Sequence, residues 1–465
     1  MHRSRPVRAP LLLSLVWTVV PCLTLAGGLP DHLAGQALHP HGDAGGETTF
    51  ALAGDAIITR KLSVFDEPEF LALRELIQGA SAAFVNLEIL FHNFEPDAIP
   101  ASESGGTYMQ ADPSIANELV WMGFDMVSMA NNHTGDYGVG GLRRTTEAVE
   151  AAGLMHAGTG ENLAEARAPG FLETPDGRVA LISAASTFPD GSRAGHQRKD
   201  VRGRPGLNPI RYSRTYEITA EQMEVLRDFQ ESLGRSRGSG DRIRMFSQTF
   251  QVGDEYRSVT TVNEGDLAEI VASVDAAKRQ ANFVIFSGHS HESGRTNNYP
   301  ADFIVELAHA VIDAGADIYL AHGPHVLRGI EIYKGKPIFY SLGDFIFQNE
   351  TVPRQPSDNY ENYRLEPEAV APDFFDARQA TGGFPSRPQV WESFVAMVRF
   401  RDGELSQIEL HPITLGHGLD RPQRGRPLLA TGDLARKIID ETREYSEPWG
   451  TEISFENGIG VIRIR

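Results

Sequence analysis

The stretch "LAHGPHVLRGIEIYKGKPIFYSLGDF", residues 320–345, carries the sequence pattern that decides the fold. It sets His322 and His325 around a Gly-Pro pair, directly after one apolar run and before two more. Apolar runs of this length are typical of buried strands in a parallel sheet. The two histidines are therefore expected on a stiff turn at the end of a buried strand, and what they do there depends on the residues that end the other strands.

Strand-like and helix-like segments alternate along the rest of the chain. The strand-like segments are residues 48–59, 82–90, 125–138, 178–186, 281–294, 316–323 and 336–345, of which 125–138 and 281–294 run into polar turns. The helix-like segments are residues 68–80, 113–124, 140–153, 265–280 and 301–315. Because βαβ units build parallel sheets, this order predicts an α/β fold with a largely parallel core.

Residues 393–415 carry a different pattern. Two strand-like runs flank Asp402-Gly403, a dipeptide typical of a β-hairpin turn. The late part of the chain is therefore expected to add antiparallel strands, which gives a mixed or two-sheet layered fold.

The N-terminus is expected to lie outside the folded domain. Basic residues followed by an apolar stretch that ends in small residues indicate a secretory signal peptide over residues 1–26. An uncleaved membrane anchor is the alternative, since the apolar run approaches the roughly 20 residues that span a bilayer, and Pro21 favours cleavage. Residues 27–47 predict a linker. We therefore expect an exported protein, periplasmic or extracellular, or else one anchored to the membrane through its N-terminus.

The main domain is predicted over residues 48–415, with a C-terminal segment, 416–465, packing on it. Two stretches, about 189–260 and 349–390, do not fit the alternating order and indicate insertions. Both are long for plain connections, and long loops in compact domains are often functional or disordered.

Composition limits the possible partners and ligands. The formal net charge is −19, which argues against nucleic acid as a partner. Cys22 is the only cysteine, and it lies within the predicted signal peptide. The mature protein would then have no disulfide, and any metal site would use His, Asp, Glu or Asn.

Polar side chains follow the ends of five of the predicted strands. They are Asp55; Asn86 and Glu88; Asn131, Asn132 and His133; His289, His291 and Glu292; and His322 and His325. Taken singly, each cluster is explained as a helix cap, a turn or a polar strand end. Ligands bind beyond the carboxyl ends of the strands of an α/β sheet, so the clusters are expected along one edge. Together they form an oxygen and nitrogen ligand set that suits one or two divalent ions such as Mn, Fe or Zn.

The motifs "GD", "NLE", "ANNHTGDYG" and "HSHE", followed by the stretch quoted above, resemble those of the CapA-type proteins of poly-γ-glutamate capsule synthesis. The likeness covers roughly residues 48–348. The CapA-type proteins in turn resemble members of the calcineurin-like metallophosphoesterase superfamily. The resemblance implies a four-layer α/β/β/α sandwich of the metallophosphatase type with mixed sheets, and a site between strand ends and loops.

The resemblance also implies roles for individual residues. The metal ligands that it implies are Asp55, Glu88, Asn132, His289, His291, His322 and His325, with Glu88 where the superfamily has a bridging aspartate. His133 would protonate the leaving group, while the ions lower the pKa of a bound water to about 7. Arg60 and Arg328 lie near motifs and would hold an anionic substrate, or alternatively form surface salt bridges.

Three departures from the superfamily pattern affect the metal site. Ile57 stands where a histidine is usual and cannot bind a metal, and two residues rather than one separate His322 from His325. One of two metal positions is therefore expected to be weak or lost. Asp344 stands where the family commonly has asparagine, which adds a carboxylate near the site or changes a turn residue.

We therefore expect an exported CapA-like protein of capsular or cell-envelope polymer (poly-γ-glutamate) biosynthesis, acting as a metal-dependent hydrolase or transferase. Its partners would be an acidic polymer or envelope substrate and a membrane-bound synthesis complex. One alternative is a non-catalytic envelope protein that binds or guides an acidic polymer. Another is a small phosphoester or nucleotide phosphodiesterase, which fold-level analogy supports only weakly.

Overall fold

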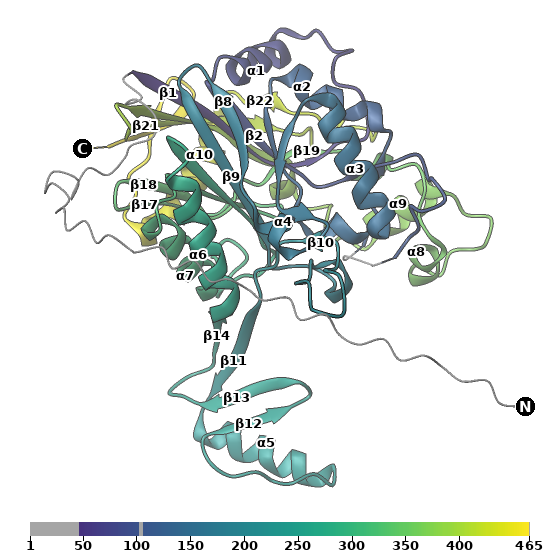
Figure 1. Cartoon of the computed structure of the whole chain (residues 1–465). Helices are drawn as coiled ribbons and strands as arrows, with labels where there is room; N and C mark the ends of the chain where they lie inside the picture. The colour runs from purple at the N-terminus through teal and green to yellow at the C-terminus, as the bar shows by residue number, and fades with distance from the viewer. Residues whose placement is uncertain (1–45, 102–105, 465) are drawn as a thin grey trace, which may run out of the picture. The chain divides into compact units, whose positions relative to one another are not determined.

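Two mixed β-sheets packed face to face form the core of the chain (Figure 1). The computed structural model describes residues 46–101 and 106–464. The predicted signal peptide, residues 1–26, and residues 27–45 of the predicted linker lie outside the described residues. Within the described part of the chain, no helix combines the length and the hydropathy needed to cross a bilayer.

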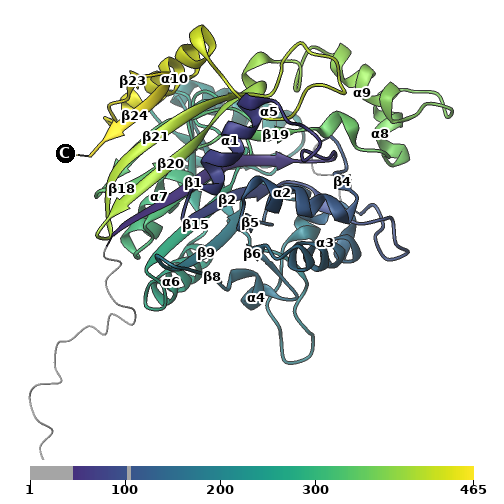
Figure 2. The same cartoon turned by 90° about the horizontal axis from the view of Figure 1, so that it is seen from above.

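The larger sheet combines a parallel half with an antiparallel half (Figure 2). In spatial order its strands are β23 (Ser454–Glu456), β24 (Ile459–Arg463), β21 (Glu404–Thr414), β20 (Glu392–Arg401), β1 (Glu47–Ile57), β2 (Ala82–Leu87), β5 (Met126–Ser128) and β6 (Met155–Ala157), with β19 (Asp344–Phe347) beside β1 and β22 (Leu428–Leu429) beside β21. β20 and β21 form the predicted hairpin, whose turn residues Asp402 and Gly403 have φ of 52° and 80°. Positive φ at both positions is typical of a type I′ turn.

The smaller sheet is parallel at its centre. In spatial order its strands are β17 (Ile330–Tyr333), β18 (Lys336–Phe339), β16 (Ile318–His322), β15 (Phe283–His289), β9 (Gly177–Ala185) and β8 (Gly170–Thr174). The outer strands β17 and β8 are antiparallel to their neighbours. The largely parallel core predicted from the alternating order is therefore present, and both sheets are mixed.

Alternating apolar residues bury both faces of the central strands. In β1, Phe50 and Leu52 point into the core between the two sheets, while Ala51 and Ala53 face the opposite side. This follows from the two-residue period of a strand. The Phe50 ring lies 5.2 Å from that of Phe283, in an edge-on contact that joins the sheets.

Helices cover the outer faces of both sheets. On the larger sheet these are α1 (Pro68–Gln78), α2 (Ala116–Met122) and α3 (Gly138–Ala152). On the smaller sheet they are α6 (Glu264–Lys278) and α7 (Asp302–Asp313), and α10 (Gly432–Ser446) packs against β21, β17 and β24. The order helix, sheet, sheet, helix confirms the four-layer α/β/β/α sandwich.

The stretches expected as insertions contain secondary structure of their own. Within 189–260 and just beyond it lies a four-stranded sheet in the order β12 (Arg242–Met245), β13 (Gln248–Val252), β11 (Tyr212–Ile218) and β14 (Arg257–Val262), with α5 (Ala220–Ser232). Residues 349–390 contain α8 (Ser357–Asn362) and α9 (Ala371–Ala380). The remaining short elements are β3 (Leu90–Phe91), β4 (Gln110–Ala111), β7 (Thr159–Gly160), β10 (Gly206–Leu207) and α4 (Leu163–Arg167). The C-terminal segment supplies β22, β23 and β24 to the larger sheet.

One predicted strand, residues 336–345, is in fact two. Its first part is β18 in the smaller sheet, and its end begins β19, which pairs with β1 in the larger sheet. The chain turns between them at Gly343, whose φ is +66°. Gly54 lies so close that a Cβ atom there would sit 1.8 Å from the Gly343 carbonyl oxygen. The two glycines thus let the chain cross between sheets beside Asp55.

Candidate metal centre

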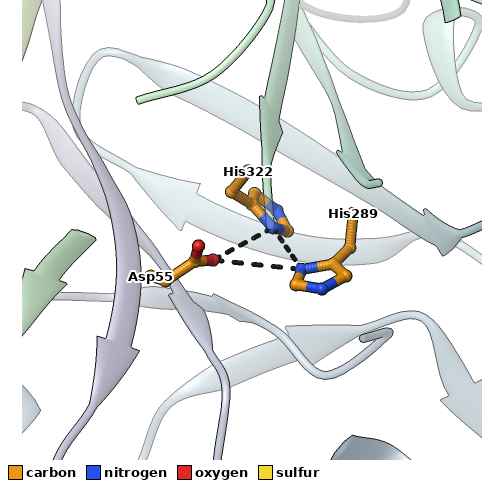
Figure 3. Close-up of side chains that lie close together, drawn as sticks. All are labelled: Asp55, His289 and His322. Atoms are coloured by element: carbon orange, nitrogen blue, oxygen red, sulfur yellow. Dashed lines mark hydrogen bonds and ion pairs between the residues drawn. The ribbon is translucent and has the colours of Figure 1, made fainter. Parts of the chain in front are cut away.

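The carboxyl ends of strands from both sheets meet at one site. Asp55 on β1 is in register with Asn86 on β2, and His289 on β15 is in register with His322 on β16. Figure 3 shows Asp55, His289 and His322 pointing toward one another from the two sheets. The topology therefore brings polar groups that are 31 to 268 residues apart in the sequence into contact, as expected for parallel strand ends.

Asp55, His289 and His322 form the first group of potential ligands. Nδ1 of His322 lies 3.3 Å from Oδ1 of Asp55 and 2.9 Å from Nδ1 of His289. All three residues are fully buried. Burial raises the pKa of the Asp55 carboxyl, but hydrogen bonding and charge from His322 outweigh burial and the pKa is lowered. Nε2 of His322 lies 2.7 Å from Oγ of Ser287, which fixes the ring orientation.

The Glu88 carboxylate lies among three histidines. Its Oε1 is 3.7 Å from Nε2 of His133, 3.8 Å from Nε2 of His325 and 4.0 Å from Nε2 of His289. Glu88 is fully buried, and neither carboxylate oxygen has a hydrogen-bond partner in the described chain. Burial and the nearby carboxylates of Asp55 and Asp344 raise its pKa well above the usual value. A buried carboxylate without hydrogen bonds is costly unless a cation binds it.

His291 and His325 complete the ring of imidazoles around Glu88. Nε2 of His291 lies 3.1 Å from Nε2 of His289, and burial, aided by the charge of His325, lowers the pKa of His291 to about 3. Nδ1 of His325 lies 2.8 Å from Oδ1 of Asp344. Burial lowers the pKa of His325, but Asp344 outweighs burial and the pKa is raised. Burial raises the pKa of Asp344 to about 6, against the opposing charge of His325.

The Gly-Pro turn between His322 and His325 sets their directions. His325 has φ of +56°, a left-handed conformation that is strained for a residue with a Cβ atom. The backbone N–H of Gly323 donates to Oδ2 of Asp55 at 2.9 Å. The turn therefore ties β16 to β1 and directs His325 toward Glu88, while His322 faces Asp55.

His133 is positioned by a short 3₁₀ helix that begins at Asn132. The Asn131 side chain caps it by accepting from the backbone N–H of His133, and Oγ1 of Thr134 accepts from the backbone N–H of Asn131. Nδ1 of His133 lies 2.7 Å from Oδ2 of Asp136, so Nε2 is the nitrogen that faces Glu88. Asn132 is buried beside His133 on the wall of a cavity.

The donor atoms at this site fit divalent metal ions. Three overlapping groups each bring their ligand atoms within 4.8 Å of one another: Asp55, His289 and His322; Glu88, His289 and His291; and Asp55, Glu88 and His325. Carboxylate oxygen and imidazole nitrogen are the donors that Mn, Fe and Zn bind. A cation at this place would bind the Glu88 carboxylate, which has no hydrogen-bond partner among the described residues, and the imidazole nitrogens that lie close together.

Of the two arginines predicted near the site, Arg60 lies elsewhere. Arg60 donates to the backbone carbonyls of Pro422 and Arg424 and does not line the cavity. Arg60 lies beyond the end of β1, so its closeness to Asp55 in the sequence does not bring its side chain to the cavity. Arg328 is buried, donates to the carbonyls of Asn297 and Glu292, and its charge acts on His291, so it forms no surface salt bridge. Its predicted role in holding an anionic substrate stays a prediction.

Several residues of the site had no role in the sequence prediction. Asp136 and Ser287 each hold a histidine ring, and Arg378 and Arg387 line the adjacent cavity. The spacing of three residues between His133 and Asp136 in the sequence could have indicated that Asp136 contacts His133. The two arginines come from the stretch expected as an insertion, and no local pattern directs them to the site.

Comparison with known proteins matches residues 49–349 to the family described as bacterial capsule synthesis protein PGA_cap. The uncharacterized protein y4sH of Sinorhizobium fredii is 37% identical over 429 residues, 90% of this chain and 93% of that protein. The capsule biosynthesis protein CapA of Bacillus anthracis is 27% identical over 270 residues, 56% of this chain and 51% of that protein.

Among solved structures, NAD nucleotidase (NadN) of Haemophilus influenzae is similar with a TM-score of 0.31 and 13% identity, over 85% of this chain and 55% of that one. A likeness this distant carries no information about the site. The family match, in contrast, contains every strand end described above and confirms the resemblance to CapA-type proteins. The chain therefore belongs to the PGA_cap family of bacterial capsule synthesis proteins.

Proposed function

We propose that this chain is an exported, metal-dependent hydrolase or transferase that acts on a capsular or cell-envelope polymer, with poly-γ-glutamate as the polymer. The observation that carries the proposal is Glu88, a buried carboxylate without hydrogen-bond partners, surrounded by the imidazoles of His133, His289 and His325. The name of the Bacillus anthracis relative, capsule biosynthesis protein CapA, supports the polymer class.

The residues that would hold the ions are those of the three ligand groups. Asp55, His289 and His322 would form one position, and Glu88 with His291 and His325 the other, with His289 and Asp55 close to both. Bound divalent ions supply Lewis-acid polarisation of the attacked group and activation of water at neutral pH. Ile57, where the superfamily has a histidine, lines the cavity and offers no ligand atom, so the second position has one donor fewer.

His133 is suited to proton transfer. Asp136 pairs with Nδ1 of His133. The nitrogen through which His133 would donate a proton is therefore Nε2, which lies nearer to Glu88. His133 also lines the cavity, where a leaving group would lie. A histidine held by a carboxylate can act as a general acid, and such a group contributes roughly 10²–10⁴-fold to a rate.

The experiment that tests this proposal compares wild type, His133→Gln and Glu88→Gln after reconstitution with Mn or Zn. Cleavage or transfer of poly-γ-glutamate is followed by the change in polymer length, with a generic phosphodiester as the second substrate. We expect His133→Gln to keep its metal and lose at least 100-fold in rate, and Glu88→Gln to lose both. Metal-loaded wild type that leaves the polymer unchanged would contradict the proposed activity, and phosphodiester cleavage alone would favour the phosphodiesterase alternative.

The non-catalytic alternative is supported by one specific observation, the apolar Ile57 at a ligand position. A protein of that kind would bind the acidic polymer without needing the ions. Polymer binding that survives both His289→Ala and Glu88→Gln, together with no reaction in wild type, would favour this alternative.

A further inference from the structure

A cavity of about 330 Å³ beside the metal centre has two arginines in its wall. Its wall includes Arg378, Arg387 and the histidines His133, His291 and His325. Among the described residues its lining contains no Asp or Glu, although the chain has a formal charge of −19. This contrast indicates that the cavity receives an anion.

Arg378 is a buried cation that forms no ion pair with a carboxylate of the described residues. It comes from α9, and one guanidinium nitrogen donates to the hydroxyl of Thr107, while the group lies 5.3 Å over the ring of Phe384. No carboxylate in the described part of the chain forms an ion pair with it, and burial lowers its pKa. Arginine nevertheless remains charged in proteins.

The buried arginine side chains of the described chain are satisfied in different ways, and Arg328 donates to the backbone carbonyls of Asn297 and Glu292. Arg167 pairs with Asp266 and Glu269, and the guanidinium of Arg424 pairs with Glu350. A buried charge is costly unless it is paired or hydrogen-bonded. Among the described residues Arg378 donates to one neutral hydroxyl and feels the charge of Glu350 without forming an ion pair with it, so a bound anion would supply a close counter-charge.

The position of Arg378 connects this charge to the metal centre. Phe384, which lies under Arg378, also packs against the ring of His325 at 4.8 Å. The field of Arg378 reaches His325, where it opposes protonation. Arg387 follows on the same insertion, is exposed and lines the same cavity, so its side chain can move toward a ligand.

We propose that Arg378 and Arg387 form an anion subsite that binds an oxyanion of the substrate, a carboxylate or a phosphate, next to the metal centre. Guanidinium groups bind both anions through charge-assisted hydrogen bonds, often in pairs. The subsite deepens the proposed function and rests on it in one respect, namely that the anion is part of the substrate on which the centre acts. Arg378 is the fixed half of the subsite, and Arg387 is the mobile half at its rim.

Calorimetric titration of the full chain with two probes, inorganic phosphate and a short γ-linked glutamate oligomer, tests the subsite. The variants are Arg378→Gln, Arg387→Gln and, as a control of equal charge change, Arg401→Gln, an exposed residue in β20. We expect each cavity variant to weaken binding by about 10-fold or more, since hydrogen bonds to charged groups are strong, and the control to bind as wild type does. The probe that loses more affinity identifies the source of the anion.

The outcomes separate this inference from the proposed function. Arg387→Gln lies on the exposed rim, so it tests the subsite even if Arg378→Gln does not fold. Equal binding by wild type and both cavity variants, or no binding of either probe to wild type, would overturn the subsite. If wild type takes up no metal and yet binds an anion through these arginines, the subsite stands and the proposed function fails.

Discussion

Nδ1 of His289 lies 2.9 Å from Nδ1 of His322, across the boundary between β15 and β16. Two imidazolium rings cannot share this contact, because like charges at that distance repel strongly in a buried site. Burial and the surrounding histidines lower the pKa of His289 well below its usual value. His289 is therefore held neutral, and one of its ring nitrogens can offer a lone pair to a cation beside the Asp55 carboxylate.

The orientation of His322 predicts an effect of Ser287 on metal affinity. Ser287→Ala removes the hydroxyl that lies 2.7 Å from Nε2 of His322. Loss of such a partner typically weakens metal binding by 10–100-fold. Competition with a chelator measures the change. Ser183→Ala is the matched control, since Ser183 is the residue in register on β9 and its buried hydroxyl has no partner within the described residues. Equal losses in both variants would show that His322 needs no such support.

Glu88 predicts opposite changes in the metal-free and metal-bound protein. Glu88→Gln removes a buried carboxyl group with a strongly raised pKa, so the free energy of unfolding of the chelated protein at pH 8 should stay the same or rise. The thermal stabilisation that added Mn or Zn gives should fall, because a ligand of two of the groups is lost. Thermal unfolding with and without metal measures both. A chelated variant less stable than chelated wild type would indicate that Glu88 is a structural residue.

The close contact between Gly54 and Gly343 predicts that Gly54→Ala is severely destabilising. A Cβ atom at position 54 would meet the Gly343 carbonyl oxygen at 1.8 Å, and both groups are backbone in a buried strand pair. Relief requires β1 and β19 to separate, so we expect a loss of several kcal/mol or failure to fold. Gly383→Ala is the control, because the nearest atom to its Cβ would be 3.6 Å away. Denaturant unfolding compares the two, and similar midpoints would contradict the crossing as described.

The buried His92 is expected to cause part of the loss of folding stability at acid pH. Burial lowers its pKa to about 4, from the usual value near 6.5. The unfolded chain therefore binds a proton before the folded chain does. Stability from neutral His92 is fully present above pH 6.5, and it falls as the pH drops toward 4, by on the order of 3 kcal/mol in total.

The His92→Gln variant isolates this effect. Its stability difference from wild type should narrow as the pH falls from 6.5 to 4, because only wild type loses the contribution of the neutral ring. Urea unfolding of chelated protein at several pH values measures the difference. Replacement of the exposed His417 in the same way controls for the loss of an imidazole ring at the surface. A constant difference between His92→Gln and wild type would mean that the His92 ring has the same pKa in the folded and the unfolded chain.

The mixed or two-sheet layered fold and the convergence of the strand ends followed from local sequence patterns, whereas the four-layer sandwich came from the resemblance to CapA-type proteins. Apolar runs ending in Asp55, His289 and His322 identify parallel strand ends, and their common edge is a consequence of topology. Long-range details had no such signal. Asp344 forms the start of β19 only because Gly54 and Gly343 let the chain cross between sheets.

For the arginines of this chain, closeness to Asp55 in the sequence does not indicate closeness to the site in the structure. Arg60 lies five residues from Asp55 in the sequence but donates to distant backbone carbonyls. Arg378 is more than three hundred residues from Asp55, and it reaches the cavity because α9 packs over Thr107 and Phe384. The direction of a long side chain depends on tertiary packing, which no local pattern encodes.

The most direct test is the divalent metal content of reconstituted wild type and His289→Ala, measured by elemental mass spectrometry. His289 belongs to two of the three ligand groups, so its loss should affect both positions. The account predicts at least one ion per chain in wild type and close to none in the variant, with the two proteins equally folded. Trace metal in wild type, or the same content in both, would contradict the metal centre.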